Sequence, residues 1–485
     1  MSINKLYITG ILILVFGIIA LFFKKATNVQ KPEAIDNIGL VSELKLSTVD
    51  TRVIDVVGFQ ERLKKPLYGF NGNNVRGPSW STPELMTGIK SLPFNVIRYP
   101  GGNVANWWDW RSGWFIEDAN LPGQYQKIPK APITLRDLKQ FVDQTNSEVV
   151  FVLNLVSDNL KSQQQMLQEA ARLGIAVNYV ELGNEFNLFV DKRYQKINKG
   201  LAYGQVANKW SAAIKKLFPD VKIGIVAGDI PKRLPDWNTE VLTSVDHTDA
   251  LVWHVYPSMK AVVTEDNGVD FKQLNTEILR LFEKSGLAQL EAGHKLWITE
   301  YNLKWHENAS NKKQLQYHVT TWGQALSMVS MTSIFTGLST NVDMILNHNL
   351  TGFPIFAAVQ SFPKPSFQLT PNGMGMKLWL DTASGMTELK KLSLFRGGLS
   401  VADYEVFGWE FCNDAGERKV FLVNLTGKPV EINLNQLYSI PFLYESFYAE
   451  KNAKVIDLTG LKQLRGKTKN GLLKLPQYSI NILNR

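Results

Sequence analysis

VNYVELGNE, residues 177–185, is a mostly apolar run that ends in glycine, an amide and a carboxylate. Its length is that of a β-strand, and its apolar character is typical of a strand buried on both faces of a parallel sheet. A carboxylate is costly to desolvate, so Glu185 at the end of such a strand requires either a buried ion-pair partner or a function. Which fold the sequence predicts depends on how many other stretches repeat this pattern.

Seven other stretches begin apolar and end in polar residues, glycine or proline. They are LYGFNGNN (67–74), NVIRYPGG (95–102), VVFVLNLVS (149–157), VKIGIVAGD (221–229), ALVWHVYP (250–257), LWITEYN (296–302) and MILNHNLTG (344–352). Helical patterns lie between them, for example at 134–145, 164–174 and 203–218. Eight strands that alternate with helices predict an α/β fold, the (β/α)₈ TIM barrel, over residues 67–384.

A doubly wound open sheet is the competing fold for alternating strands and helices. It predicts a G-x-G-x-x-G turn after an early strand, and the sequence contains none. In a TIM barrel the active site lies at the C-terminal ends of the strands. The polar ends of the eight runs should therefore face one cleft.

The C-terminal residues 385–485 have a different pattern, with short alternating runs separated by NDAG and TGKP. Such turns are hairpin signals, so this region is predicted to be a β-sandwich. Residues 38–66 contain strand-like alternation at 39–57. We expect these N-terminal strands to join the sandwich, because an isolated hairpin is unstable.

The N-terminal residues 1–37 contain an uncharged apolar stretch at 6–23, followed by a polar linker. Its 18 residues reach the lower limit for a membrane-spanning helix. No small-x-small cleavage site follows, so an uncleaved membrane anchor is favoured over a cleaved signal peptide. The catalytic domain is then expected outside the cytoplasm, membrane-anchored, or secreted or periplasmic if the segment is cleaved.

The charge balance and the single cysteine exclude several classes of protein. Lys and Arg exceed Asp and Glu by 53 to 44, but no dense basic block or RNA-binding signature accompanies the excess, so no nucleic acid partner is expected. Cys412 alone cannot form an intramolecular disulfide or a Cys-rich metal site. The sequence HEN at 306–308 lacks the second His of a zinc protease motif. We expect no metal and no cofactor, and the oligomeric state stays open.

Two carboxylates end two of the predicted strands, Glu185 on the fourth and Glu300 on the seventh. Strands four and seven lie across the mouth of a closed barrel, so the two side chains can converge. Either Glu alone could be a buried ion-pair partner, but facing carboxyl groups are the equipment of glycoside hydrolysis. A separation of about 5–5.5 Å gives retention of configuration, and about 6.5–9.5 Å gives inversion.

The motif GNE on the fourth strand, together with WITEYN on the seventh, resembles the clan A retaining glycoside hydrolases. The resemblance implies that Glu185 is the acid/base, that Glu300 is the nucleophile and that Asn184 binds the sugar 2-hydroxyl. RYPGGN (98–103), ELGNE (181–185) and the predicted sandwich are most similar to the α-L-arabinofuranosidases of the clan. The heparanase and β-glucuronidase family is the main rival, and xylosidase-like members come third.

Five further residues are expected to bind substrate or to orient the carboxylates. Arg98 should orient the nucleophile or pair with a substrate acid. His254 and Tyr256, in the motif HVY, should donate to Glu300. Asn154 ends the third strand and should contact sugar hydroxyls, and Trp107 in NWWDW (106–110) is a candidate for stacking on sugar, although packing inside a loop is equally open.

The sequence therefore predicts a glycoside hydrolase with an oligo- or polysaccharide substrate and a membrane contact through residues 6–23. A catalytically inactive barrel that binds carbohydrate and a membrane scaffold are the alternatives from other classes. The identity of the sugar, the linkage and exo or endo action are left open.

Overall fold

The computed structural model describes most of the compact unit formed by Thr51–Arg485. The described residues are 53–72, 75, 77–117, 121–188, 197–228, 234–246, 248–264, 268–290, 293–304, 319–353, 355–361, 364–439, 441–455 and 460–484. The predicted membrane segment, residues 6–23, lies outside them. None of the helices within the described ranges has the length and apolar character needed to cross a membrane.

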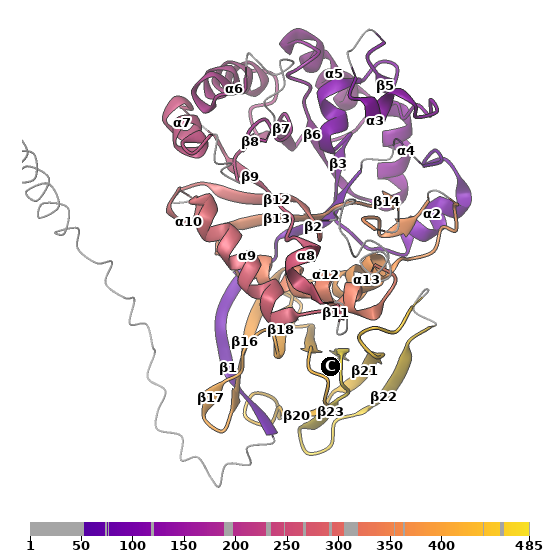
Figure 1. The fold of residues 1–485 in the computed structure, drawn as a ribbon, viewed down its shortest axis with the longest axis vertical. Helices are drawn as coiled ribbons and strands as arrows, with labels where there is room; N and C mark the ends of the chain where they lie inside the picture. Colours follow the sequence, from indigo (N-terminus) through magenta and orange to yellow (C-terminus); the bar gives the residue numbers. More distant parts are fainter. Residues whose placement is uncertain are drawn as a thin grey trace, which may run out of the picture. The chain divides into compact units, whose positions relative to one another are not determined.

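Eight parallel strands close into a barrel, which confirms the predicted TIM-barrel fold (Figure 1). In barrel order they are β2 (Leu67–Asn71), β3 (Val96–Tyr99), β6 (Glu148–Val152), β7 (Tyr179–Leu182), β8 (Lys222–Val226), β9 (Ala250–Val255), β12 (Lys295–Tyr301) and β13 (Val342–Asn347). Each overlaps one of the eight apolar runs. Nearly all their residues are buried, as expected for strands covered by helices on one side and by barrel-filling side chains on the other.

The barrel is filled by alternate residues of its strands. Its central cluster contains Val96, Val150, Ala250, Val252, Trp297, Met344 and Leu346. The residues between them, such as Ile97, Val149 and Ile298, belong to the larger core under the helices. This alternation fixes which strand residues can reach the mouth of the barrel.

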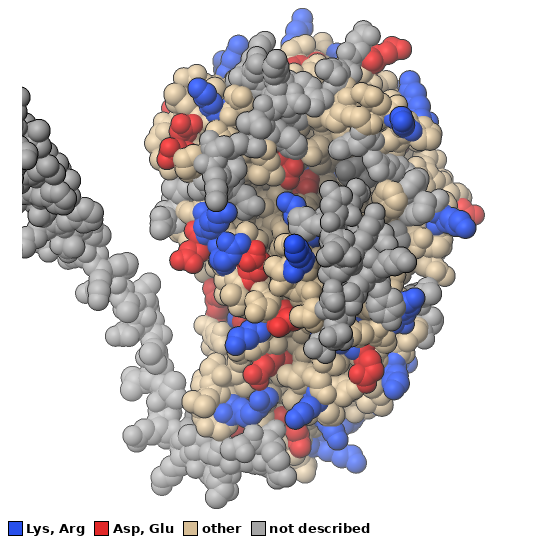
Figure 2. All heavy atoms as spheres, in the orientation of Figure 1, with Lys and Arg blue, Asp and Glu red and all other residues tan. Residues whose placement is uncertain are grey.

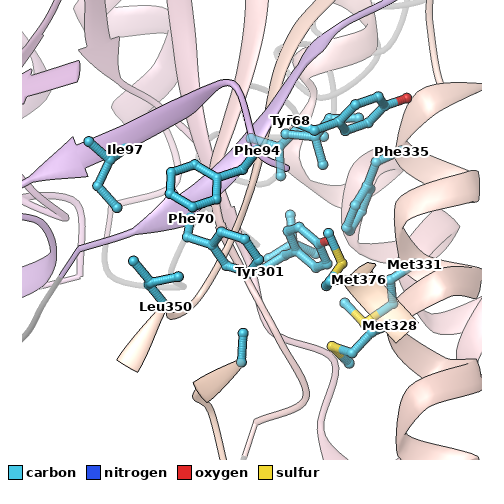
Figure 3. Close-up of a cluster of buried hydrophobic side chains, with 14 of the residues drawn as sticks. Tyr68, Phe70, Phe94, Ile97, Tyr301, Met328, Met331, Phe335, Leu350 and Met376 are labelled. Atoms are coloured by element: carbon cyan, nitrogen blue, oxygen red, sulfur yellow. The ribbon is translucent and has the colours of Figure 1, made fainter. Parts of the chain in front are cut away.

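The main helices around the barrel form amphipathic or fully buried segments. They are α2 (Pro83–Lys90), α4 (Leu135–Thr145), α5 (Leu160–Arg172), α6 (Gly200–Lys215), α7 (Trp237–Ser244), α9 (Phe271–Ser285), α12 (Trp322–Thr336) and α13 (Pro371–Ala383). The helix α4 begins with a capping box between Thr134 and Asp137, which satisfies donors at its N-terminus. The core between barrel and helices includes Tyr301, Phe335 and Met376 (Figure 3).

Short elements in the loops complete the barrel. They are η1 (Gly102–Trp107), β4 (Trp108–Asp109), β5 (Trp114–Phe115), α3 (Gly123–Gln126), α8 (Met259–Val262), β10 (Val263–Thr264), β11 (Gly268–Val269), α10 (Leu287–Leu290), β14 (Thr351–Gly352) and β15 (Val359–Gln360).

A ten-stranded, mostly antiparallel sheet follows the barrel, which confirms a β-rich C-terminal domain. Its strands are β1 (Val53–Lys64), β16 (Glu388–Arg396), β17 (Leu399–Ser400), β18 (Val406–Cys412), β19 (Arg418–Asn424), β20 (Val430–Asn433), β21 (Leu443–Tyr448), β22 (Lys462–Lys467), β23 (Leu472–Leu475) and β24 (Ser479–Asn484). Hydrogen-bonded pairing joins all ten into one sheet rather than two separate ones.

The N-terminal strand β1 pairs with the C-terminal sheet, antiparallel to β16 and parallel to β20 (Figure 1). It differs from the strand pattern expected at 39–57: it continues to Lys64, because β16 pairs with it as far as Glu388. Residues 39–52 lie outside the described ranges. The sheet contacts the barrel through α12, where the indole of Trp409 donates to Ser333 Oγ at 2.9 Å. Since both sides of α12 are covered, the helix is buried almost all round.

Candidate active site

A pocket of about 670 Å³ lies at the C-terminal ends of the barrel strands. Four residues that follow or end different strands line it: Glu185 after β7, His254 on β9, Glu300 on β12 and His348 after β13. The polar ends of at least these four strands therefore face one cleft. Both Glu185 and Glu300, named from the sequence, are brought together there.

The Glu300 carboxylate is buried and surrounded by donors. Its Oε1 accepts from Arg98 Nη1 at 2.6 Å and from Asn71 Nδ2 at 3.2 Å, and its Oε2 accepts from the Tyr256 hydroxyl at 2.6 Å. Burial raises the pKa of Glu300, but the charges of His254 and Arg98 and the Tyr256 hydrogen bond outweigh it and hold the pKa at about 2. Glu300 is therefore an ionised carboxylate at neutral pH.

A β-bulge brings Glu300 into the pocket. The pairing of β12 with β9 shifts register between Trp297 and Glu300. Such a bulge re-aims the side chains that follow it. As a result Thr299 contacts His254 while Glu300 faces Arg98.

The Glu185 carboxylate lies across from Glu300 and is more open to the pocket, with 14% of its side chain exposed against 5% for Glu300. Its Oε1 is 3.0 Å from His254 Nδ1. One oxygen from each carboxylate lies within 4.8 Å of the other. This spacing fits the shorter of the two carboxyl separations used by glycosidases.

The backbone before Glu185 turns sharply at the end of β7. Gly183 has φ 86° and Glu185 has φ 53°, both in the left-handed region. A Cβ on Gly183 would lie 2.2 Å from the Phe186 ring. Glycine at 183 therefore allows the turn that points Glu185 into the pocket.

His254 is a partner of Glu185 more than of Glu300, which corrects the sequence prediction. Its Nδ1 is 3.0 Å from Glu185 but 3.9 Å from Glu300, and its Nε2 contacts Thr299 Oγ1 at 3.1 Å. Burial lowers the pKa of His254, but the Glu300 and Glu185 carboxylates together raise it by more than burial lowers it. The net shift of the pKa is therefore upward. Tyr256, in contrast, contacts Glu300 as expected, and burial raises its pKa well above the usual value.

Arg98 is completely buried, and its polar atoms all point to protein groups. Its Nε and Nη2 contact Glu181 Oε2 at 2.8 and 2.7 Å, its Nη1 contacts Glu300, and its Nη2 donates to Asn184 Oδ1 at 2.9 Å. It therefore orients the nucleophile candidate. The expected alternative, an ion pair between Arg98 and a substrate acid, is wrong in this geometry because the guanidinium has no exposed surface.

Asn184 is also buried, and both ends of its amide have protein partners. Its Nδ2 donates to Asn103 Oδ1 at 2.9 Å, and Asn103 lines the pocket. Contact of Asn184 with a sugar hydroxyl stays a prediction.

Like Arg98 and Asn184, two more of the predicted substrate-binding residues, Asn154 and Trp107, do not line the pocket. Asn154 uses its oxygen to accept from two backbone N–H groups and its nitrogen to donate to Trp108 O, so it organises the loop after β6. Trp107 is buried in η1, with its ring 6.1 Å from that of Tyr125. Tyr125, not Trp107, is the aromatic residue of that loop that lines the pocket.

The sequence reasoning missed several residues that the structure brings to the site. Asn71 ends the first strand, so the rule of polar strand ends could have found it. Glu181 is a charge inside an apolar strand, which signals a buried partner. Tyr125 and Lys304 line the pocket from loops and carried no signal in the sequence.

Glu185, His254 and Glu300 offer three ligand atoms within 4.8 Å of one another, so they form a group that could hold a metal ion. The Arg98 guanidinium, 2.6 Å from Glu300, places a fixed positive charge beside these atoms. That charge opposes a second cation at the same carboxylate.

Comparison with known proteins gives a consistent set of relatives. No protein-family model matches the chain. The intracellular exo-α-(1→5)-L-arabinofuranosidase of Acetivibrio thermocellus is 22% identical over 306 residues, which cover 56% of this chain and 59% of that protein. The chain thus matches less than two thirds of the length of this relative.

Solved structures of low identity share the fold. An α-L-arabinofuranosidase of glycoside hydrolase family 51 from Thermotoga petrophila RKU-1 has a TM-score of 0.68 at 15% identity, over 89% of this chain and 99% of its own. A 4-O-α-L-rhamnosyl-β-D-glucuronidase from Fusarium oxysporum 12S has a TM-score of 0.61 at 13% identity, over 89% and 100%. The resemblance predicted from the motifs is confirmed, and at these identities the structural likeness establishes the fold.

Proposed function

We propose that this protein is a retaining glycoside hydrolase with Glu300 as nucleophile and Glu185 as acid/base. One observation carries the proposal: an ionised, donor-rich Glu300 faces a second carboxylate at a separation within 4.8 Å. Similarity to arabinofuranosidases in sequence and in fold supports it.

In the first step Glu300 attacks the anomeric carbon, the glycosidic C–O bond breaks, and Glu185 gives its proton to the departing oxygen. In the second step a water oxygen bonds to the anomeric carbon, the ester bond to Glu300 breaks, and the water proton goes to Glu185. Arg98, Asn71 and Tyr256 hold the Glu300 carboxylate before the first step and receive it again after the second.

The substrate class that we propose is α-L-arabinofuranosides at the ends of oligo- or polysaccharides. The names of the relatives support this class. A pocket of about 670 Å³ has the size typical of a small-ligand site. Hydrolysis of 4-nitrophenyl α-L-arabinofuranoside, followed by NMR of the first-formed anomer, tests both the sugar and the retention.

The roles of the two carboxylates are tested by Glu300→Ala and Glu185→Ala. Both variants should lose turnover, and azide should restore Glu300→Ala with a product of opposite anomeric configuration. The matched control is Glu277→Ala on α9, which removes a carboxylate paired with Arg280; neither residue lines the pocket. Wild-type turnover in both site variants would refute the proposal, and sugar binding without hydrolysis by the wild type would favour an inactive carbohydrate-binding barrel.

A second candidate is a hydrolase of acidic sugars, and Lys304 favours it. Lys304 lines the pocket, and among the described lining residues the only carboxylates are Glu185 and Glu300. An exposed ammonium at the pocket would attract a sugar carboxylate. On this reading 4-nitrophenyl β-D-glucuronide is cleaved faster than the β-D-glucoside, and Lys304→Gln removes that preference while Lys304→Arg keeps it.

The net positive charge is weaker support for an acidic substrate. On the face shown in Figure 2, Lys and Arg side chains are interspersed with Asp and Glu.

We also propose that residues 6–23 anchor the protein with its catalytic domain outside the cytoplasm. Release of the full chain from membranes by salt alone, without detergent, would contradict this anchor.

A further inference from the structure

Glu181 on β7 is a buried carboxylate immediately behind the site. It is 0% exposed and does not line the pocket. Its Oε2 receives both Nε and Nη2 of Arg98, at 2.8 and 2.7 Å, while its Oε1 has no hydrogen-bond partner among the described residues. A buried carboxylate with one unsatisfied oxygen is costly, so Arg98 is the reason for its presence.

Arg98 is shared between two carboxylates that differ in chemistry. Its Nη1 contacts Glu300 Oε1 at 2.6 Å, and its other side contacts Glu181. Glu300 loses its negative charge when it becomes a glycosyl ester and regains it when the ester is hydrolysed. Glu181 forms no bond to the sugar in either step, because it does not line the pocket.

We propose that Glu181 is a positioning residue that keeps the buried Arg98 cation balanced while Glu300 changes between carboxylate and ester. The inference rests on the proposed double-displacement function. Without the Glu181 charge, the first step would leave an uncompensated guanidinium in the barrel, beside a sugar that is itself becoming positive. Glu181 thereby lowers the barrier of the first step, in which Glu300 gives up its charge.

The variant Glu181→Gln separates the two steps of the reaction. Glutamine has the same shape and its oxygen can still accept from Arg98, but it carries no charge. Arg98 then binds ionised Glu300 more strongly, so attack by Glu300 slows by about 10²-fold. The second step, which restores the Glu300 charge beside Arg98, should not slow.

A purely structural role for Glu181 predicts a different result. If the substitution only let Arg98 move away, Glu300 would lose a charged donor at 2.6 Å and become easier to protonate. The charged or titratable groups that face Glu300 are Arg98, His254, His348, Tyr256 and Glu185. Because Glu181→Gln leaves all of them in place, the acid limb of kcat/KM should not move to higher pH.

The test is stopped-flow hydrolysis of a 2,4-dinitrophenyl glycoside, with the arabinofuranoside or the glucuronide chosen by wild-type activity. The good leaving group makes the second step limiting in the wild type, which gives a burst of dinitrophenol. We expect Glu181→Gln to lose the burst, because its first step becomes limiting, and to keep the acid limb at the wild-type pH. An unchanged burst, or an acid limb that moves up, would overturn the inference.

Two further variants complete the design. Glu410→Gln removes a fully buried carboxylate paired with Lys390 in the C-terminal sheet and should leave the burst unchanged. Glu181→Asp keeps the charge and should keep the burst; its loss there would overturn the inference even if Glu181→Gln does not fold. A wild type inactive on both glycosides would count against the proposed function, whereas an active wild type with an unaffected Glu181→Gln would count against Glu181 alone.

Discussion

Replacing Tyr256 by Phe removes the hydroxyl that donates to Glu300 Oε2 at 2.6 Å and leaves the ring in place. A hydrogen bond to a charged group contributes about 1.5–3 kcal/mol. One pKa unit corresponds to about 1.4 kcal/mol, so the loss amounts to about 1–2 units. The pKa of Glu300 should therefore rise from about 2 to about 3–4 in Tyr256→Phe.

The sign of the effect on stability follows from the direction of the shift. Because its pKa in the folded protein lies below the ordinary value of about 4.3, Glu300 contributes stability above that pH. The contribution is lost as the pH falls towards about 2. Tyr256→Phe should therefore be destabilised most at neutral pH, and its difference from the wild type should shrink as the pH falls through about 3–4 towards about 2.

The assay is the pH profile of kcat/KM, together with urea unfolding at several pH values. The acid limb should move to higher pH by about 1–2 units in Tyr256→Phe. The matched control is Tyr438→Phe, whose hydroxyl donates to buried Glu410 at 2.8 Å in the C-terminal sheet. An acid limb that stays in place in Tyr256→Phe, or that moves equally in Tyr438→Phe, would refute the assignment of Tyr256 as the donor that keeps Glu300 ionised.

Three other substitutions test the supporting structure. Gly183→Ala should lower the thermal unfolding midpoint more than Gly385→Ala. Both glycines have a positive φ, which costs alanine about 1–2 kcal/mol, but only a Cβ at position 183 would also clash with Phe186. Asn154→Ala should lower the free energy of unfolding in urea by about 1–3 kcal/mol, because two backbone N–H groups lose their acceptor, and kcat/KM should change little. Loss of activity at unchanged stability would instead support the predicted contact of Asn154 with sugar. Asn71→Ala should lower kcat/KM by about 10²-fold, since it removes a donor to Glu300, and wild-type kinetics would exclude that role.

The fold was predictable because each barrel strand carries its own signal. Apolar runs of strand length that end in polar residues locate all eight strands, and the fold places their ends at one cleft. The same reasoning locates Glu185, Glu300 and Arg98. It also placed an N-terminal strand in the C-terminal sheet, but it could not give the partner or the register of that strand, because β1 and β16 lie more than 300 positions apart in the sequence.

The site was less predictable where loops and bulges decide it. Trp107 and Tyr125 are both aromatic residues of the segment that follows β3, and the sequence does not distinguish which of them reaches the pocket. Both are largely buried, and the packing of η1 decides that Tyr125 rather than Trp107 lines the pocket. The bulge before Glu300 likewise places Thr299 in contact with His254 Nε2, and this contact leaves His254 Nδ1 facing Glu185.

Glu181 differs from these cases, because strand alternation alone could have found it. On β7, Tyr179 packs against the cluster inside the barrel, and Val180 and Leu182 belong to the core under the helices. Glu181 must then point into the barrel, as must Arg98, which lies two residues after the inward Val96 on β3. Two opposite charges on inward positions of nearby strands predict a buried ion pair directly beneath the carboxylates. The general consequence is that a charge inside an apolar barrel strand is best paired first with inward charges of neighbouring strands, and only then considered as a pocket residue.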